Sequence, residues 1–334
     1  TDNFLVYSSL VLASIKKLQI AAFFAECHKK CNFASRLTDK GRIMKKIILA
    51  LATLLFMGSA ATKAQVTKVT VRSISGNSKE EVENIDNAKY RITYEGKWVN
   101  NPSIKPFIYT DSEMRLDIGE KATSFYDRTK QVKDSLMNEK AKTGNFDFSD
   151  LPKGGRFPFS YYKNYPSTGK SIQLESVGTT DYKCTENVET PDWQLIPDSA
   201  TTIIGYHCQL AKTNFKGRTW YAWYAEDIPL PEGPWKLIGL PGLTLKAYDE
   251  NKEYSFTAIG MSTLTAPTPI TFPKAKREEI SQKDLREFKE KFTPGMVLET
   301  LNIKNIKIQD EKGNPIDMKK FMNKKNVFNP IELQ

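Results

Sequence analysis

Hydrophobic and polar residues alternate along much of the chain in the pattern typical of β-strands. Tyr90, Ile92 and Tyr94 alternate with polar residues, and residues two apart lie on one face of a strand, so that face is expected to be buried. Similar patterns predict strands at residues 69–73, 107–109, 114–118, 123–126, 171–177 and 180–188. We therefore expect a mainly β (α+β) fold, an antiparallel, curved sheet of several hairpins with one or two packed helices.

Two hairpins are predicted in the second half of the chain. Alternation over residues 204–210, a turn at 215–218 and an aromatic strand at 219–225 indicate the first hairpin. Strands at 244–248 and 253–261, separated by a polar turn, indicate the second. The segment between the hairpins contains four prolines, which fix φ and stiffen a loop: Pro229, Pro231, Pro234 and Pro241.

Two segments are predicted to be helices. Residues 128–141 contain no proline or glycine and many helix formers. Residues 281–292 begin with a serine that can cap a helix. They also place Leu285, Phe288 and Phe292 on one stripe, which is the spacing of an amphipathic helix.

A secretory signal peptide is predicted at residues 44–64. Two lysines follow Met44, an apolar run covers residues 47–57, and small residues precede Gln65, which are the three parts of a signal peptide and its cleavage site. A bilayer is spanned by about 20 apolar residues, and this run is shorter. A segment that stays uncleaved as a membrane anchor is therefore the less favoured alternative. We expect an exported protein, periplasmic or extracellular, that is cleaved after Ala64 and has no transmembrane segment beyond it.

The predicted cleavage site divides the chain into three parts and changes its charge. Residues 1–43 are interpreted as an upstream start chosen too early, and residues 65–334 as a single β-rich domain. Residues 1–64 hold ten of the 49 Lys and Arg and three of the 39 Asp and Glu, so residues 65–334 carry +3 instead of +10. A charge this small gives no reason to expect a nucleic-acid partner.

Two cysteines remain after the predicted cleavage, Cys184 and Cys208. Exported proteins meet an oxidising compartment, which favours a disulfide between them, with Cα atoms within about 7 Å. The alternative is a pair of reduced, buried thiols.

Residues 65–334 contain few of the side chains that catalytic sites require. His207 is the one histidine of residues 65–334, and strand alternation places it on the face opposite Cys208, where we expect it to be exposed and structural. The sequence shows no Zn²⁺-ligand spacing, calcium loop or phosphate-binding loop. We therefore expect a non-enzymatic protein without catalytic, metal or cofactor residues. Glu226 and Asp227, beside the aromatic strand, leave a carboxylate-based hydrolase as an alternative.

Aromatic residues are the class that most suggests binding. The candidates are Trp220, Trp223, Tyr224 and Trp235, which lie on the strand at 219–225 and in the loop after it. One interpretation is a thick core between the sheet and a covering helix. The other is an apolar groove that binds a lipid, a peptide or a partner strand.

The loop between the hairpins ends in the run Gly239-Leu240-Pro241-Gly242-Leu243-Thr244. This run resembles the signature of the GLPGLI family, with Thr244 in place of the last isoleucine. Further segments resemble that family at residues 205–211, 217–218, 222–224, 228–229, 233–234 and 329–333. The resemblance implies an exported protein of Gram-negative bacteria and supplies no activity.

The signature run has no side chain that could act as an acid, a base or a nucleophile. Glycine bends the backbone and leucine fills a core, so we expect a packing device in which Leu240 and Leu243 are buried. The alternative is a loop that contacts a ligand.

Three functions are compatible with the sequence. The first is an envelope protein that binds a hydrophobic ligand, such as a lipid or peptide, or an envelope partner. The second is a structural or interaction module serving an outer-membrane transport system, and the third is the carboxylate-based hydrolase. A deep apolar cavity would favour the first, an exposed aromatic face the second, and a cleft with facing carboxylates the third.

Overall fold

The computed structural model describes residues 65–66, 81–143, 149–300, 308–309, 317–324 and 327–334. The signal peptide expected at 44–64 and the strand expected at 69–73 lie outside the described residues. The chain divides into two compact units. The sheet unit comprises residues 80–131, 153–292 and 325–334, and the helical unit comprises residues 1–79, 132–152 and 293–324. The expected single domain over 65–334 stays a prediction.

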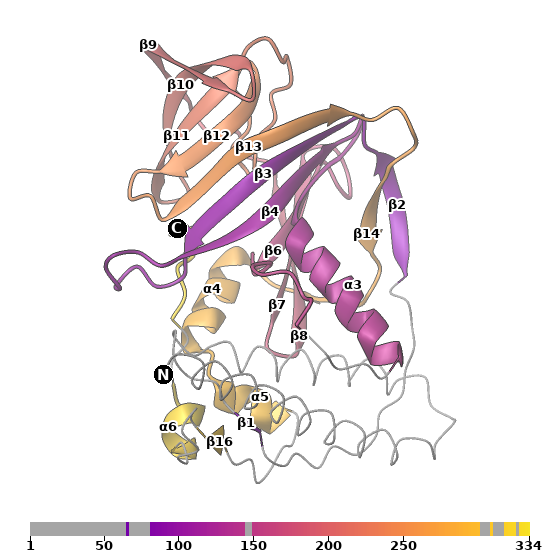
Figure 1. The fold of residues 1–334 in the computed structure, drawn as a ribbon, viewed down its shortest axis with the longest axis vertical. Coiled ribbons are helices and arrows are strands. Elements are labelled where there is room, and N and C mark those ends of the chain that lie inside the picture. Colours follow the sequence, from indigo (N-terminus) through magenta and orange to yellow (C-terminus); the bar gives the residue numbers. More distant parts are fainter. Residues whose placement is uncertain (1–64, 67–80, 144–148, 301–307, 310–316, 325–326) are drawn as a thin grey trace, which may run out of the picture. The chain divides into compact units, whose positions relative to one another are not determined.

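The sheet unit is built on one 12-stranded sheet in the order β15-β8-β7-β6-β5-β4-β3-β13-β12-β11-β10-β9 (Figure 1). All neighbouring strands are antiparallel except β15 and β8, which are parallel. The expectation of a mainly β fold with an antiparallel sheet is confirmed. The strands are β3 (Tyr90–Val99), β4 (Tyr109–Ile118), β5 (Thr123–Asp127), β6 (Phe159–Lys163), β7 (Lys170–Val177), β8 (Thr180–Asn187), β9 (Gln194–Ile203), β10 (Tyr206–Phe215), β11 (Arg218–Ala225), β12 (Leu243–Asp249), β13 (Tyr254–Thr263) and β15 (Glu278–Glu279).

A second, two-stranded sheet of this unit pairs β2 (Val82–Asn87) with β14 (Pro269–Pro273). The helix α4 (Gln282–Lys291) also belongs to this unit, and the Ser281 hydroxyl accepts a hydrogen bond from the Asp284 amide at its start, as the sequence predicts. Its Leu285 is buried, and its Phe288 ring lies 5.8 Å from the Tyr182 ring on β8.

The helical unit contains short elements. They are β1 (Gln65–Val66), β16 (Ile308–Gln309), α5 (Pro294–Thr300) and α6 (Met318–Met322). The helix α3 (Arg128–Thr143) begins in the sheet unit and continues into this one, and it confirms the helix predicted at 128–141.

The predicted hairpins form with the turns that their residues favour. Strands β10 and β11 are joined by Lys216 and Gly217, which both have positive φ, the two-residue turn that matches strand twist. Two details differ from the prediction. Ile204 and Gly205 form the turn between β9 and β10 instead of starting a strand. Of the strand predicted at 107–109, only Tyr109 is in a strand.

Three β-bulges curve the half of the sheet from β9 to β13. They lie between Gln209 and Leu210, between Trp223 and Tyr224, and between Ala258 and Gly260. A bulge bends its strand and increases the local twist. In Figure 1 the strands β9 to β12 accordingly turn out of the plane of β3 and β4.

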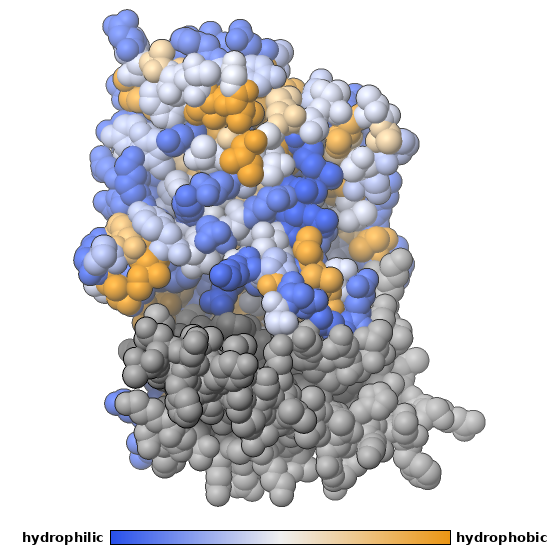
Figure 2. Space-filling model, viewed as in Figure 1, coloured by the Kyte–Doolittle hydropathy of each residue, from blue (hydrophilic) through white to orange (hydrophobic). Residues whose placement is uncertain are grey.

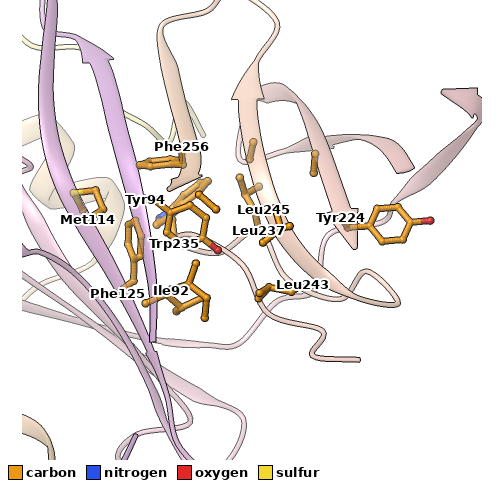
Figure 3. Packing of buried hydrophobic residues seen from close by; sticks show 14 of the residues in the cluster. Ile92, Tyr94, Met114, Phe125, Tyr224, Trp235, Leu237, Leu243, Leu245 and Phe256 are labelled. Atoms are coloured by element: carbon orange, nitrogen blue, oxygen red, sulfur yellow. The ribbon is translucent and has the colours of Figure 1, made fainter. Parts of the chain in front are cut away.

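The concave inner face of this curved region is filled by the chain's own residues. Strand side chains such as Tyr94, Met114 and Phe256 meet Trp235 and Leu237, which come from the loop between β11 and β12 (Figure 3). We call residues 226–242 the β11–β12 loop. All five of these side chains are 2% exposed or less, so the loop completes the hydrophobic core.

The edge strand β9 has an irregular backbone. Among the described strands it pairs only with β10, and its side chains are mostly exposed. Pro197 lacks an amide hydrogen and Asp198 has a φ of 60°, so the free edge cannot continue as a regular ladder.

Candidate functional site

The signature run forms a tight bend at the end of the β11–β12 loop. The Gly239 amide donates to the Pro231 carbonyl at 3.0 Å, and the Leu243 amide donates to the Ile228 carbonyl at 3.0 Å. Gly239 has a φ of 93°, a conformation that favours glycine. A Cβ atom on Gly242 would lie 2.0 Å from the Ala225 carbonyl oxygen. Both glycines are therefore required by the bend.

The two leucines of the run point into the core. Leu240 is 1% exposed and Leu243 is fully buried, which confirms the burial expected from the sequence. The Trp193 indole donates to the Ile238 carbonyl at 2.8 Å and covers the bend. The geometry is that of a packed turn, and it presents no reactive side chain.

Three of the four candidate binding aromatics lie inside the protein. Trp220, Tyr224 and Trp235 are 1% exposed or less. The ring of Trp235 lies 5.6 Å from that of Trp220 and 6.0 Å from that of Phe215. Figure 3 shows Tyr224 directed away from the other core side chains. Only Trp223 of the four is half-exposed, on the opposite face of β11.

An aromatic surface that the sequence analysis missed lies on this opposite, outer face. Tyr221 on β11 and Tyr248 on β12 are cross-strand partners, with stacked rings 5.5 Å apart and 16° from parallel. The ammonium of Lys252 lies 3.3 Å from the centre of the Tyr248 ring, that of Lys246 lies 5.8 Å from it, and that of Lys212 lies 5.4 Å from the Tyr221 ring. We call this set, together with Trp223, the aromatic platform.

The platform lysines form no ion pair among the residues that the structure describes. In the described part of the chain, none of Lys212, Lys246 and Lys252 forms an ion pair with a carboxylate. Burial lowers the pKa of Lys252, the charge of Lys246 adds to that shift, and the charge of Asp249 opposes it. Strand alternation places Tyr221 and Trp223 on one face of their strand, and Lys246 and Tyr248 on one face of theirs, but only the pairing of β11 with β12 brings the two sets together.

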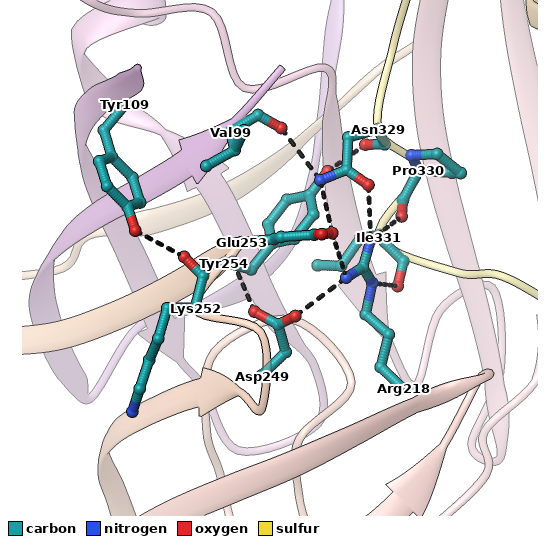
Figure 4. Close-up of polar contacts among 10 residues, drawn as sticks. All are labelled: Val99, Tyr109, Arg218, Asp249, Lys252, Glu253, Tyr254, Asn329, Pro330 and Ile331. Atoms are coloured by element: carbon teal, nitrogen blue, oxygen red, sulfur yellow. Dashed lines mark hydrogen bonds and ion pairs between the residues drawn. The ribbon is translucent and has the colours of Figure 1, made fainter. Parts of the chain in front are cut away.

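Arg218 organises the inner side of the same hairpin (Figure 4). It is 5% exposed, and each of its five N–H donors has a partner. The acceptors are the Asp249 carboxylate at 3.0 Å, the Glu253 carboxylate at 2.8 Å, the Asn329 side chain at 2.7 Å, and the carbonyls of Pro330 and Ile331 at 2.7 and 3.1 Å. Burial raises the pKa of Asp249, although the Tyr254 amide and Arg218 oppose the shift.

Residues 327–334, which we call the tail, are fixed by these and further contacts. The Asn329 amide donates to the Val99 carbonyl at 3.1 Å, and the Tyr254 hydroxyl donates to the Asn329 carbonyl. The Lys236 ammonium of the β11–β12 loop donates to the carboxylates of Glu332 at 2.7 Å and Glu186 at 2.6 Å. Burial lowers the pKa of Lys236, but these two carboxylates outweigh burial and raise that pKa overall. The segments at 217–218 and 329–333, which are part of the family resemblance, therefore meet in space.

A shallow depression lies beside the tail. Its lining includes Glu175, Lys289 of α4 and Glu332. Lys289 pairs with Glu175, and Lys236 pairs with Glu332. Both carboxylates are thus held by a lysine, and the depression offers no unpaired acid or base from this set.

The expected disulfide is wrong. Cys184 and Cys208 are both buried and free. Cys184 is on β8 and Cys208 is on β10, and eight strands separate β8 from β10 in the sheet order. Burial raises the pKa of both thiols, that of Cys184 to about 12, so neither is a thiolate at neutral pH.

The other candidates for chemistry are scattered. His207 is exposed, as expected. Glu226 and Asp227 are exposed at the start of the β11–β12 loop. Among the described residues, no group of His, Cys, Asp and Glu could hold a metal ion. No helix within the described ranges is long and apolar enough to cross a membrane.

Comparisons with known proteins give only distant likenesses. No protein-family model and no curated protein match the chain. Among solved structures it is similar to PNGF-II in a P21 crystal form, with 18% identity and a TM-score of 0.39 over 60% of this chain and 33% of that one. A Vibrio parahaemolyticus domain, provisionally named an outer membrane lipoprotein-sorting protein domain, gives 7% identity and a TM-score of 0.22 over 59% of this chain and 89% of that one. The matched part spans about a third of PNGF-II, and similarities this distant identify no activity.

Proposed function

We propose that this chain is an exported, non-enzymatic interaction module of the Gram-negative cell envelope and a member of the GLPGLI family. It binds an acidic envelope partner through the aromatic platform. The observation that carries the proposal is the stacked pair Tyr221 and Tyr248, flanked by three lysines that form no ion pair among the described residues.

The platform has the chemistry of a recognition surface. Aromatic rings are enriched at protein interfaces because they bury much area at a low cost in conformational entropy. Lysines on such a surface attract an acidic partner and speed its association. Here the stacking and cation–π contacts hold the side chains in place before binding.

The two other functions have less support. A hydrophobic-ligand carrier needs an apolar cavity, and the concave face of this sheet is filled by Trp235, Leu237 and Leu240. A carboxylate-based hydrolase needs two acids facing a substrate cleft, whereas Glu226 and Asp227 are neighbours on an exposed turn.

The test is native mass spectrometry of the full chain purified from its own envelope. Parent protein is compared with a variant in which Tyr221 and Tyr248 are serine and with one in which Lys212 and Lys246 are glutamate. The matched control replaces Tyr165 with serine and Lys170 with glutamate, on β7 and the turn before it. We expect a co-purified species that both platform variants lose, that the control keeps, and that high salt releases.

Other outcomes would contradict the proposal. A bound lipid that survives both platform variants would favour the carrier. Turnover of a glycan that is abolished by Glu226→Gln would favour the hydrolase.

A further inference from the structure

An exposed apolar turn joins β3 to β4. We call residues 100–108 the β3–β4 tip. Ile104 is 37% exposed and Ile108 is 59% exposed, and Tyr109 at its base is 43% exposed. Figure 2 shows apolar surface gathered at this hairpin, which projects from the sheet in Figure 1. Contiguous exposed apolar side chains on one projection mark an interaction site.

The tip is held in a defined conformation. At its start, the Trp98 indole donates to the Asn100 side chain at 3.1 Å, and the Asn100 amide donates to the Thr110 hydroxyl at 2.7 Å. At its end, the Tyr109 hydroxyl donates to the Lys252 carbonyl at 2.9 Å. The apolar side chains are therefore presented by a turn that is tied to the sheet on both sides.

The one charged residue of the tip is basic. Residues 100–109 contain Lys105 and no acidic residue, and Asp111 is the first carboxylate beyond them. The Lys105 ammonium lies 3.2 Å from the centre of the Phe107 ring. Lys252 contacts Tyr109 only through its backbone carbonyl, because its ammonium lies over the Tyr248 ring. Isoleucines at the end, aromatic rings behind them and a lysine over one ring are arranged as in proteins that bind the interface of a bilayer.

From this geometry we infer that the β3–β4 tip docks on an anionic lipid surface. Ile104 and Ile108 enter the boundary between headgroups and acyl chains, Tyr109 lies at headgroup depth, and Lys105 leaves the Phe107 ring to contact lipid phosphate. A protein partner is disfavoured by size. A stable protein interface buries about 800 Å² on each side, which is more than a nine-residue turn offers. The inference does not depend on the function proposed for the aromatic platform.

The test is co-sedimentation of the full chain with vesicles. One set of vesicles is phosphatidylcholine alone, and the other is phosphatidylcholine mixed with phosphatidylglycerol. The variants are Ile108→Asp, Ile104→Ser combined with Ile108→Ser, and Lys105→Gln. The matched control is Ile259→Asp, because Ile259 is 58% exposed on β13 and lies outside the tip. All variants share the same N-terminal residues, so a difference between them reports the tip.

We expect the parent and Ile259→Asp to bind the anionic vesicles equally. Ile108→Asp and the double serine variant should lose that binding. Lys105→Gln should bind about fivefold more weakly, which corresponds to about 1 kcal/mol for one lysine near an anionic surface. Circular dichroism should show that every variant remains folded, since the substituted side chains are exposed.

Two outcomes would overturn the inference. One is no parent binding to either set of vesicles. The other is equal binding by the parent and the tip variants. Loss of the partner expected at the aromatic platform, with vesicle binding intact, would concern only the proposed function.

Discussion

Two proline-containing loops of the sheet unit carry large apolar side chains with opposite environments. In the β11–β12 loop, Trp235, Leu237 and Leu240 are buried. In the β3–β4 tip, Ile104 and Ile108 are exposed. The first loop lies against the concave face of the curved sheet, and the second extends beyond the end of two strands (Figures 1 and 3). Apolar composition alone therefore does not decide burial, which requires a facing surface.

The largest expected effect comes from an anchor that both loops share. Arg218 holds the tail, and the tail contacts Val99 at the base of the tip and Lys236 in the β11–β12 loop. Arg218→Met should leave the buried carboxylate of Asp249 and the partly buried carboxylate of Glu253 without their cation. The expected loss is about 3–5 kcal/mol in the free energy of unfolding, measured by urea denaturation.

The same variant should show a distinctive pH dependence. Asp249 already has a raised pKa in the folded protein, so its contribution to stability falls as pH rises above the ordinary carboxyl value of 3.8. Removing Arg218 raises that pKa further. The deficit of Arg218→Met relative to the parent should therefore shrink as the pH is lowered from 7 toward 4, and a deficit that grows would contradict this account.

The core beneath the β11–β12 loop and the exposed tip should differ in their sensitivity to truncation. Leu243→Ala should cost about 2–5 kcal/mol, because it opens a cavity next to the β11–β12 loop. Ile108→Ala in the tip should change stability by less than about 0.5 kcal/mol. Thermal unfolding of both variants measures the contrast, and equal effects would show that the two environments do not differ as described.

Replacing Gly239 with alanine should have a smaller effect on stability, and Gly169 provides the matched control. Alanine at Gly239 would combine a positive φ with a Cβ atom 2.2 Å from the Thr190 methyl group. Gly169 has a φ of 78° and nothing within 4 Å of such a Cβ atom. Both substitutions should cost about 1 kcal/mol for the backbone, and Gly239→Ala should cost more. Identical losses would mean that Thr190 moves aside freely.

Reduction is expected to have no effect on stability. Both loops are held by noncovalent contacts, since Cys184 and Cys208 are free. A reducing agent should leave the melting temperature unchanged, and both thiols should react with Ellman's reagent only after unfolding. A melting temperature that drops on reduction would show that the two cysteines do form a disulfide.

Local features of the fold were predictable from the sequence. The turn at Lys216 and Gly217, the helix capped by Ser281 and the burial of Leu243 each follow from residues within a few positions of one another. The apolar residues at 107–109 were predicted as a strand because periodicity does not distinguish a buried run from an exposed tip.

Long-range features were not predictable in the same way. The Tyr94 hydroxyl donates to the Thr244 carbonyl across 150 residues, and Arg218 reaches Ile331 across 113. The separation of Cys184 from Cys208 depends on the strand order, which no local pattern contains. The aromatic platform depends on the register between β11 and β12 for the same reason.

The saturated guanidinium of Arg218 also has a consequence for the timing of folding. Three of its five hydrogen bonds go to residues 329–331, and the Leu333 amide closes onto the Lys216 carbonyl at 2.8 Å. Until these residues have been synthesised, Arg218 lacks three of its five acceptors. The packing around Arg218 is therefore expected to be among the last parts of the sheet unit to form.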